Sequence, residues 1–360
     1  MAGSTYGNIF KISTWGESHG KALGVVVDGC PAGINLCEED IQKFLNRRKP
    51  GQSKFTTQRN EDDKVEILSG VFDGKTTGTP VSMVVKNKDH HSADYTDIAS
   101  YYRPGHADFT FDEKYGFRDY RGGGRSSGRE TIGRVAAGAI ASKILESLGI
   151  EITTYSKSIG NVEIDYSKFK KDEIPNNPMY MPDNDAATKA AELLKEKMKE
   201  MDSVGGIIEC LVDGMPAGVG ETVFDKLDAN LAKAVMSIGA IKGIEFGDGF
   251  KVTELTGSTD NDGFKIENDT IEKTSNHAGG ILGGMSDGSQ IVKPTPSLAR
   301  SQDTINKAGE NISINIKGRH DPIIVPRAVV VVESMVAVTL VDMLFTNMTA
   351  RIDKIVDFYK

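Results

Sequence analysis

The chain has 360 residues, of which 38% are hydrophobic and 26% are charged. These proportions exclude a disordered chain, and the formal net charge of −8 argues against a protein that coats nucleic acid through bulk positive charge. The 39 glycines exceed the usual share of about 7%. They gather in clusters that also contain apolar or arginine residues, so they are not flexible linkers.

The chain shows no membrane span and no export signal. The longest apolar stretch, 323–348, is interrupted by Arg327, Glu333 and Asp342, which favours a buried helix. The segment MAGSTYGNIFK at the start contains no apolar signal-peptide region. Three cysteines are too few and too scattered for a disulfide framework or a zinc cluster. We therefore expect a cytoplasmic protein with reduced thiols, no metal site and no membrane partner.

The predicted elements alternate between short strands and helices. In chain order, the hydrophobic patterns predict strands at 23–27, 65–68, 81–85, 207–212, 250–255 and 312–316. They predict helices at 38–48, 128–148, 224–236 and 326–345, and irregular segments at 49–63, 87–97, 165–187 and 256–276. Ser127 and Glu130 fit a capping box before the second helix. The last helix is apolar on nearly every face, as expected of a helix covered on both sides.

One segment occurs twice. VDGCPAG at 27–33 recurs as VDGMPAG at 212–218, with six of seven positions identical. Each copy follows a predicted strand and precedes a predicted helix, and Asp40 and Asp225 keep the same offset from the two copies. We interpret the chain as one domain over 1–360 with two pseudo-symmetric halves related by duplication.

The segment Gly16-Glu17-Ser18-His19-Gly20 carries the first candidate chemistry. Its G-x-S-x-G pattern matches the nucleophile elbow of α/β-hydrolases, which requires a strand before it and a helix after it. The apolar residues that follow predict a second strand instead. This context argues against a hydrolase or phosphatase that uses Ser18 and His19, and that function remains only as the alternative. The other interpretations are a surface turn, or an acid–base His19 in a glycine-lined pocket.

Arginines gather at the predicted start of the 128–148 helix. Four of them lie within 118–129, together with three consecutive glycines. The free N–H groups and dipole of a helix N-terminus suit phosphate or carboxylate, glycine lets the backbone approach an anion, and arginine supplies paired donors. The segment lacks the Gly-Lys-Ser/Thr of a Walker A motif. It predicts an anion site, with a solvated basic turn as the alternative.

Three further segments add charged groups. His106 lies between Arg103 and Asp108 in a predicted turn that would place and tune an imidazole. The basic loop at 46–50 is either an anion clamp or a complement to a helix dipole. Asp321, within 317–322, would stay ionised near several arginines. Together these groups indicate a small, multiply anionic substrate. A non-catalytic phospho-ligand or nucleic-acid binder is the other alternative, against which the net charge counts.

The chain as a whole resembles the chorismate synthase family. The resemblance rests on GESHG at 16–20, RPGHAD at 103–108, RDYRGGGRSSGRET at 118–131, SNHAGGILGG at 275–284 and KGRHDP at 317–322, in the family's order. It implies an α+β fold, a β-α-β sandwich with apolar helices buried between two antiparallel sheets, and a homotetramer. It also implies a lyase that converts 5-enolpyruvylshikimate 3-phosphate to chorismate and phosphate by 1,4-elimination with reduced FMN. This is the last step of the shikimate pathway.

The resemblance also implies a role for individual residues. His106 would protonate or stabilise the reduced flavin, His19 would assist the leaving phosphate, and Asp321 would act with flavin N5 in removing the C6 hydrogen. FMN would be bound by Arg125, Ser126, Ser127, Gly239, Ala240, Gly283, Lys293, Pro294, Thr295, Pro296, Ser297 and Arg319. The substrate's phosphate and carboxylates would be held by Ser18, Arg48, Lys54, Arg103 and Arg129.

Two features depart from the family pattern. Lys54 stands where relatives carry arginine, which keeps the charge but loses the bidentate fork. The stretch 288–293 is shorter than in relatives, and this affects the expected flavin contact of 293–297. NADPH or an external flavin reductase would supply the reduced flavin.

Overall fold

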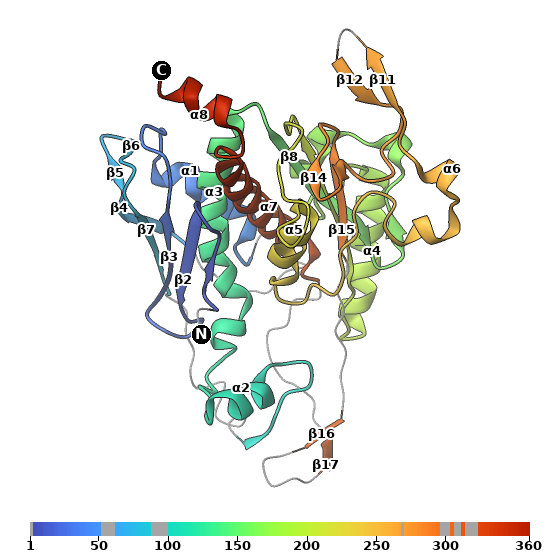
Figure 1. Cartoon of the computed structure of the whole chain (residues 1–360). Coiled ribbons are helices and arrows are strands. Elements are labelled where there is room, and N and C mark those ends of the chain that lie inside the picture. The colour runs from blue at the N-terminus through green and yellow to red at the C-terminus, as the bar shows by residue number, and fades with distance from the viewer. Residues whose placement is uncertain are drawn as a thin grey trace.

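The computed structural model describes residues 3–51, 62–87, 100–267, 270–295, 303–305, 311–313 and 323–360. Two antiparallel sheets form its frame (Figure 1). The first has the order β1-β2-β3-β7-β4, with the strands Thr5–Tyr6, Lys11–Gly16, Ala22–Asp28, Val81–Lys86 and Val65–Ser69. The second has the order β15-β10-β8-β9, with the strands Ile291–Thr295, Gly206–Asp213, Glu151–Ile159 and Val162–Glu163.

Two-stranded hairpins complete the β-structure of the described residues. They are β5–β6 (Val71–Phe72, Lys75–Thr76), β11–β12 (Phe264–Glu267, Thr270–Lys273), β13–β14 (Ile281–Leu282, Met285–Ser286) and β16–β17 (Asp303–Ile305, Asn311–Ser313). The pairing in every one of them is antiparallel.

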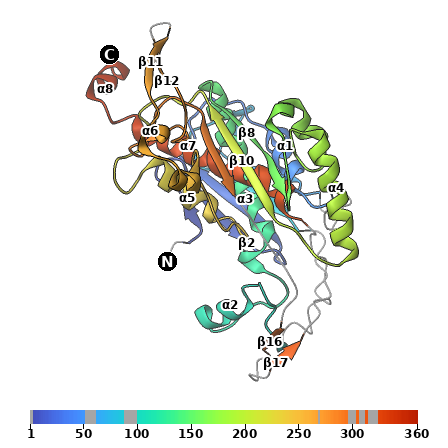
Figure 2. The same ribbon diagram turned by 90° about the vertical axis from the view of Figure 1, so that its right-hand side faces the viewer.

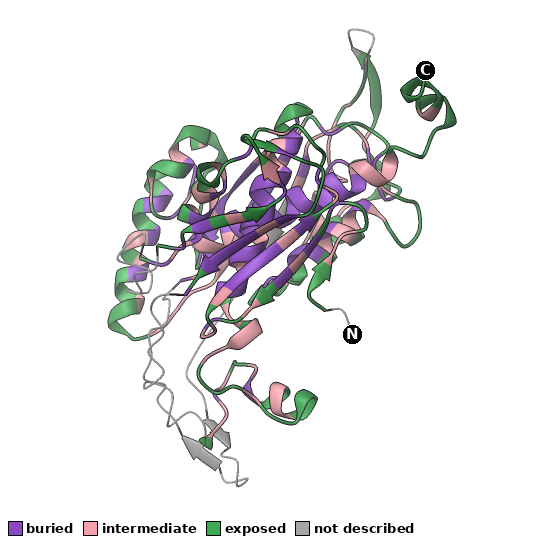
Figure 3. Cartoon of the chain, turned by 90° about the vertical axis from the view of Figure 1, so that its left-hand side faces the viewer, coloured by how far each residue is buried: buried purple, intermediate pink, exposed green. Residues whose placement is uncertain are grey.

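The central helices pack on one another and on the sheets. They are α1 (Glu38–Arg48), α3 (Thr131–Ser147), α5 (Leu227–Met236) and α7 (Val325–Asn347). Figures 1 and 2 place α3 and α7 between the two sheets, and Figure 3 shows the buried residues concentrated in this region. The other helices are α2 (Asp108–Tyr115), α4 (Asn184–Lys199), α6 (Gly257–Asp260) and α8 (Ile352–Phe358). The prediction of an α+β fold with antiparallel sheets is confirmed.

Helix α7 is a core helix. It is long and apolar enough to cross a membrane, but 83% of its most apolar window is buried inside the fold. It crosses α3 so closely that a Cβ on Gly138 would lie 2.2 Å from the Cβ of Ser334. The apolar character on all faces, noted in the sequence, therefore reflects contact with α3 and with β8 and β10 of the second sheet.

The two copies of the repeated segment make equivalent hydrogen bonds. In the first copy, the hydroxyl of Thr76 on β6 donates to Pro31 O (2.6 Å) and accepts from Ile34 N (3.0 Å). The same two bonds, at the same two distances, join Ser286 on β14 to Pro216 and Val219 in the second copy. Each turn is thus fixed by a short hydroxyl side chain from a hairpin later in the chain.

Three segments have a different secondary structure from the one predicted. The segment 250–255 is not a strand, because all of it except Leu255 belongs to a 3-10 helix, Gly249–Glu254. Left-handed backbone at Gly247 (φ +56°) and Gly249 (φ +57°) turns the chain there, and Phe250 is 77% exposed. The stretch 165–187 is not irregular throughout, because it contains the 3-10 helices Tyr166–Lys168 and Lys171–Asn176 and the first turn of α4. The stretch 256–276 is not irregular either, because it contains α6 and the β11–β12 hairpin. The predicted helix at 38–48 has the observed bounds of α1, and the one at 224–236 begins three residues later than predicted, at Leu227.

Candidate active site

The approach to α3 consists of two short 3-10 turns, Gly124–Ser126 and Gly128–Glu130. Ser127 lies between them, and its Oγ accepts a hydrogen bond from Arg129 N (3.3 Å). Glu130 does not complete the predicted capping box, because its carboxylate accepts hydrogen bonds from Thr14 and Arg134 instead. The capping prediction is therefore correct for Ser127 and wrong for Glu130.

His19 lies in the loop between β2 and β3, against the glycine run that precedes α3. The loop is closed by a hydrogen bond from Gly20 N to Glu17 O (3.1 Å). Ser18 is buried, and its Oγ lies 3.0 Å from His19 Nδ1. A Cβ on Gly122 would lie 2.1 Å from the same nitrogen, so the imidazole packs directly on the backbone at 122. Because β3 follows the loop, the strand–turn–helix context of a hydrolase elbow is absent here.

Two of the predicted substrate arginines share one carboxylate that sequence reasoning missed. Arg48, the last residue of α1, donates to Asp63 Oδ2 (2.8 Å), and Arg129 pairs with Asp63 Oδ1 (3.1 Å). The exposed fractions of the three side chains are 2% for Arg48, 5% for Arg129 and 0% for Asp63. Arg48 also donates to Thr131 Oγ1 (3.1 Å), at the start of α3. Two guanidiniums on one carboxylate leave an excess of positive charge, which suits an anionic substrate.

Asn87, directly after β7, joins this cluster to the His19 loop. Its Oδ1 accepts from Arg129 Nε (3.2 Å) and NH2 (2.8 Å). Its Nδ2 donates to Glu17 O (3.0 Å) and Gly20 O (2.8 Å), on either side of His19. The structure thus connects His19 with the predicted substrate residues Ser18, Arg48 and Arg129.

Arg125, a predicted flavin residue, is held against β2. It donates to Thr14 Oγ1 (2.7 Å) and to Gly16 O (3.1 Å). The same Thr14 hydroxyl donates to Glu130 Oε1 (2.8 Å), and Glu130 lies 3.6 Å from the Arg125 guanidinium. This network fixes Arg125 to the first sheet and to the start of α3.

The network continues to a second group of predicted flavin residues. Arg134 donates to Glu130 Oε2 (2.7 Å) and to Ser237 Oγ (2.5 Å). Ser237 is the C-cap residue of α5. Gly239 and Ala240 follow Ser237, and Ala240 has left-handed backbone (φ +69°). Hydrogen bonds therefore connect the Arg125 segment with the segment of Gly239 and Ala240, although the two lie far apart in the sequence.

Gly283 lies at the other end of α5. It occupies the turn of the β13–β14 hairpin (φ +61°), where Gly284 O accepts from Leu227 N (2.7 Å), the first residue of α5. A ten-residue helix spans about 15 Å, and Gly283 and Ala240 lie near its opposite ends. Within β15, Lys293, Pro294 and Thr295 pair with Cys210, Glu209 and Ile208 of β10. Five predicted site residues lie outside the described residues: Lys54, Pro296, Ser297, Arg319 and Asp321.

The first turn of α7 lies beside the arginine cluster. Arg327 Nε donates to the carbonyl oxygen of Arg48 (3.1 Å). Because Arg48 also contacts Thr131 of α3, the N-terminal turns of α3 and α7 both meet the C-terminal end of α1. Two helix N-termini near one point add positive potential where an anion would bind.

The segment before α2 is ordered by a buried carboxylate. Asp108 accepts from Arg103 Nε and NH2, both at 2.8 Å, and pairs with Arg118 NH1 at 2.8 Å. Burial acts to raise the pKa of Asp108, but hydrogen bonds from Arg103 and the charges of both arginines lower it to about 2. His106 is exposed, and its Nδ1 lies 2.9 Å from Pro104 O. Asp108 therefore binds the two arginines, and the expectation that it tunes the imidazole gains no support.

Replacing Asp108 by Asn should loosen this turn in a pH-dependent way. The folded-state pKa lies below the ordinary value of 3.8, so the ion pair stabilises the fold above about pH 4 and is lost as the pH falls towards 2. We expect a loss on the order of 2 kcal/mol at pH 7, measured as hydrogen-exchange protection of 101–118, that shrinks towards pH 3. Asp119→Asn, which breaks an exposed pair with Arg121, should cost less than about 1 kcal/mol. A pH-independent difference for Asp108→Asn would contradict the assignment.

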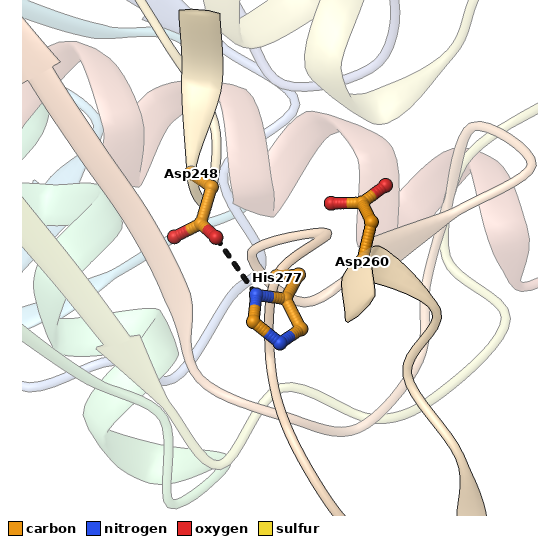
Figure 4. Close-up of side chains that lie close together, drawn as sticks. All are labelled: Asp248, Asp260 and His277. Atoms are coloured by element: carbon orange, nitrogen blue, oxygen red, sulfur yellow. Dashed lines mark hydrogen bonds and ion pairs between the residues drawn. The ribbon is translucent and has the colours of Figure 1, made fainter. Parts of the chain in front are cut away.

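A separate group of titratable side chains consists of Asp248, Asp260 and His277 (Figure 4). One potential ligand atom of each lies within 4.8 Å of the others. His277 Nδ1 lies 2.7 Å from Asp248 Oδ2, and this hydrogen bond raises the pKa of the imidazole, as do the nearby carboxylates. Sequence reasoning found no metal constellation, because these residues come from three separated segments. Such groups are common without an ion, so we assign no metal to this one.

Comparison with known proteins identifies the family. Residues 10–345 match the family described as chorismate synthase. The chain belongs to the chorismate synthase family. The chorismate synthases of Agathobacter rectalis and Lachnospira eligens are 68% and 65% identical to it over the full length of both chains. A crystal structure of a chorismate synthase superposes with a TM-score of 0.78 at 29% identity, covering 98% of this chain and 97% of the other. The predicted family is confirmed, and with it the predicted activity, a lyase reaction at the last step of the shikimate pathway.

Proposed function

We propose that the site at the N-terminus of α3 forms chorismate from 5-enolpyruvylshikimate 3-phosphate with reduced FMN as cofactor. The observation that carries the proposal is the buried Arg48–Asp63–Arg129 cluster, joined through Asn87 to the His19 loop. A cation cluster beside an imidazole suits a reaction in which phosphate leaves. The arginines would hold the anionic groups, and His19 would assist the departing phosphate.

The residues around Arg125 and α5 suit a flavin. Open space borders Gly124, Gly128 and Gly239, since a Cβ on any of them would meet nothing within 4 Å. Glycine backbone at a helix N-terminus can approach a phosphate, and Arg125 and Ser127 lie in the same segment. Reduced FMN, when bound, would supply an electron-rich ring system to the elimination. Ser126, Ser127, Gly239 and Ala240 would bind it, and His106 would hold or deliver a proton at the reduced ring.

The remaining features of the proposal concern the assembly and its setting. We propose a single domain with a pseudo-twofold β-α-β sandwich, for which the equivalent bonds of Thr76 and Ser286 are the support. We further propose a cytoplasmic homotetramer without nucleic-acid or membrane partners. NADPH or an external flavin reductase would reduce the flavin.

Anaerobic turnover with photoreduced FMN tests the proposed function. We expect chorismate and phosphate in equal amounts when FMN is reduced, and neither product with oxidised FMN or without flavin. Adding NADPH to oxidised FMN will show whether the protein reduces its own flavin. In His106→Ala, turnover should fall by about 100-fold or more, the usual scale for a lost acid–base group, with an unchanged circular dichroism spectrum. Equal turnover without flavin would contradict the proposal.

A further inference from the structure

We propose that Asn87 is a positioning residue that couples the substrate-binding Arg129 to the imidazole of His19. The inference rests on the proposed function, because it takes the roles of these two residues from it. Asn87 was not among the predicted site residues. It is 8% exposed, and its side chain uses all its hydrogen-bonding atoms on just two partners, Arg129 and the His19 loop.

The orientation of the Asn87 amide follows from its neighbours. The amide nitrogen faces the carbonyl oxygens of Glu17 and Gly20, which can only accept, at 3.0 and 2.8 Å. The amide oxygen faces the guanidinium of Arg129, which can only donate. A flipped amide would lose all these bonds, so the network itself decides which atom is nitrogen. The backbone adds a further bond, from Asn87 N to Lys21 O (3.1 Å).

These contacts form a closed network around His19. Asn87 fixes the residues on either side of His19, and the ring of His19 packs on Gly122. From Gly122 the chain runs through the two 3-10 turns to Arg129, which returns to Asn87. One amide side chain and one glycine contact therefore link the guanidinium of Arg129 to the imidazole of His19.

A fixed distance between these two groups matters for the reaction. A phosphate held by arginine receives help from an imidazole only if both reach its oxygens at hydrogen-bond distance. A misplacement of about 1 Å costs on the order of 100-fold in rate. Releasing the loop should therefore lower kcat, whereas releasing Arg129 should raise KM.

Asn87→Asp tests the contact between Asn87 and the His19 loop. The new carboxylate keeps an acceptor for Arg129, but it places an oxygen where Nδ2 donates to two carbonyl oxygens. The His19 loop should be repelled while Arg129 stays bound. We expect kcat with reduced FMN to fall about 100-fold and the pH profile of kcat to shift. KM should also rise, because the added carboxylate cancels the excess positive charge of Arg48 and Arg129. Asn87→Ala removes the hydrogen bonds to the His19 loop and those to Arg129 without adding repulsion, so it should lower kcat and also raise KM.

A double-mutant cycle distinguishes positioning from general destabilisation. If Asn87 acts through His19, Asn87→Asp should have little further effect on kcat in a His19→Ala background. Asn177 provides the matched control, because its amide also donates to two carbonyl oxygens, of Glu173 (2.8 Å) and Met181 (2.7 Å), in another loop. Asn177→Asp should lower the melting temperature and leave kcat, KM and the pH profile unchanged.

The outcomes separate this inference from the proposed function. A kcat within about twofold of wild type in both Asn87 variants would overturn the positioning role, as would full additivity with His19→Ala. If Asn87→Asp does not fold, the same two criteria apply to Asn87→Ala. Absence of reduced-FMN turnover in the wild-type protein, or wild-type activity in His19→Ala, would instead contradict the proposed function.

Discussion

Replacing Gly138 by Ala should destabilise the protein, although alanine is the better helix former. Helix propensity alone predicts a gain of about 1 kcal/mol in the interior of α3. The added Cβ, however, would lie 2.2 Å from the Cβ and 2.5 Å from the Cα of Ser334. Ser334 is fully buried in α7, and its hydroxyl donates to Val330 O (2.7 Å), so it cannot move aside. The two helices would have to separate, and overpacking of this kind costs about 1–3 kcal/mol or more.

We expect a net loss of about 2 kcal/mol in the free energy of unfolding, measured by urea denaturation. Gly257→Ala provides the control, because Gly257 is the first residue of α6 and a Cβ there would meet nothing within 4 Å. That substitution should be neutral or slightly stabilising. A Gly138→Ala protein as stable as wild type would show that α3 and α7 do not cross in backbone contact.

Helix α1 was predicted well because its signals are local, whereas α4 was missed although Asp183 caps its N-terminus. The α1 segment combines an apolar stripe with acidic residues in its first turn and basic residues in its last, and its predicted bounds are the observed ones. The strand prediction at 250–255 failed because apolar residues at alternate positions need a neighbouring strand to pair with. The glycines at 247 and 249 turn that segment into a 3-10 helix at the surface instead.

The candidate site was predictable where its residues form sequence motifs. It was not predictable where a residue matters only through contacts with residues far away in the sequence. The arginine- and glycine-rich segment before α3 has a composition that indicates an anion site by itself. Asp63 and Asn87 have no such signal, since each becomes meaningful only when folding brings Arg129 beside it. A weak clue exists for Asn87: it lies two residues after the end of the predicted strand 81–85, and strand ends meet the loops of neighbouring strands. Pairing of β7 with β3 places it beside the His19 loop.

Replacing Asp63 by Asn should cost about 3–5 kcal/mol, the usual penalty for removing one partner of a buried ion pair. The carboxylate lies between Arg48 (2.8 Å) and Arg129 (3.1 Å), and its side chain is completely buried. Asparagine keeps the size and tolerates the left-handed backbone of this position (φ +44°). The lost free energy of unfolding therefore measures the cost of leaving two guanidiniums without a buried countercharge. Urea denaturation at pH 7 measures it.

Asp73→Asn is the matched control, because Asp73 also has left-handed backbone (φ +49°) but is exposed. It should change stability by less than about 0.5 kcal/mol. If the arginines bind anions, inorganic phosphate should restore stability to Asp63→Asn more than it stabilises wild type or Asp73→Asn, because it replaces the missing negative charge. An Asp63→Asn protein as stable as the control would mean that the arginines do not depend on this carboxylate. The anion site would then have to be held by the helix N-termini alone.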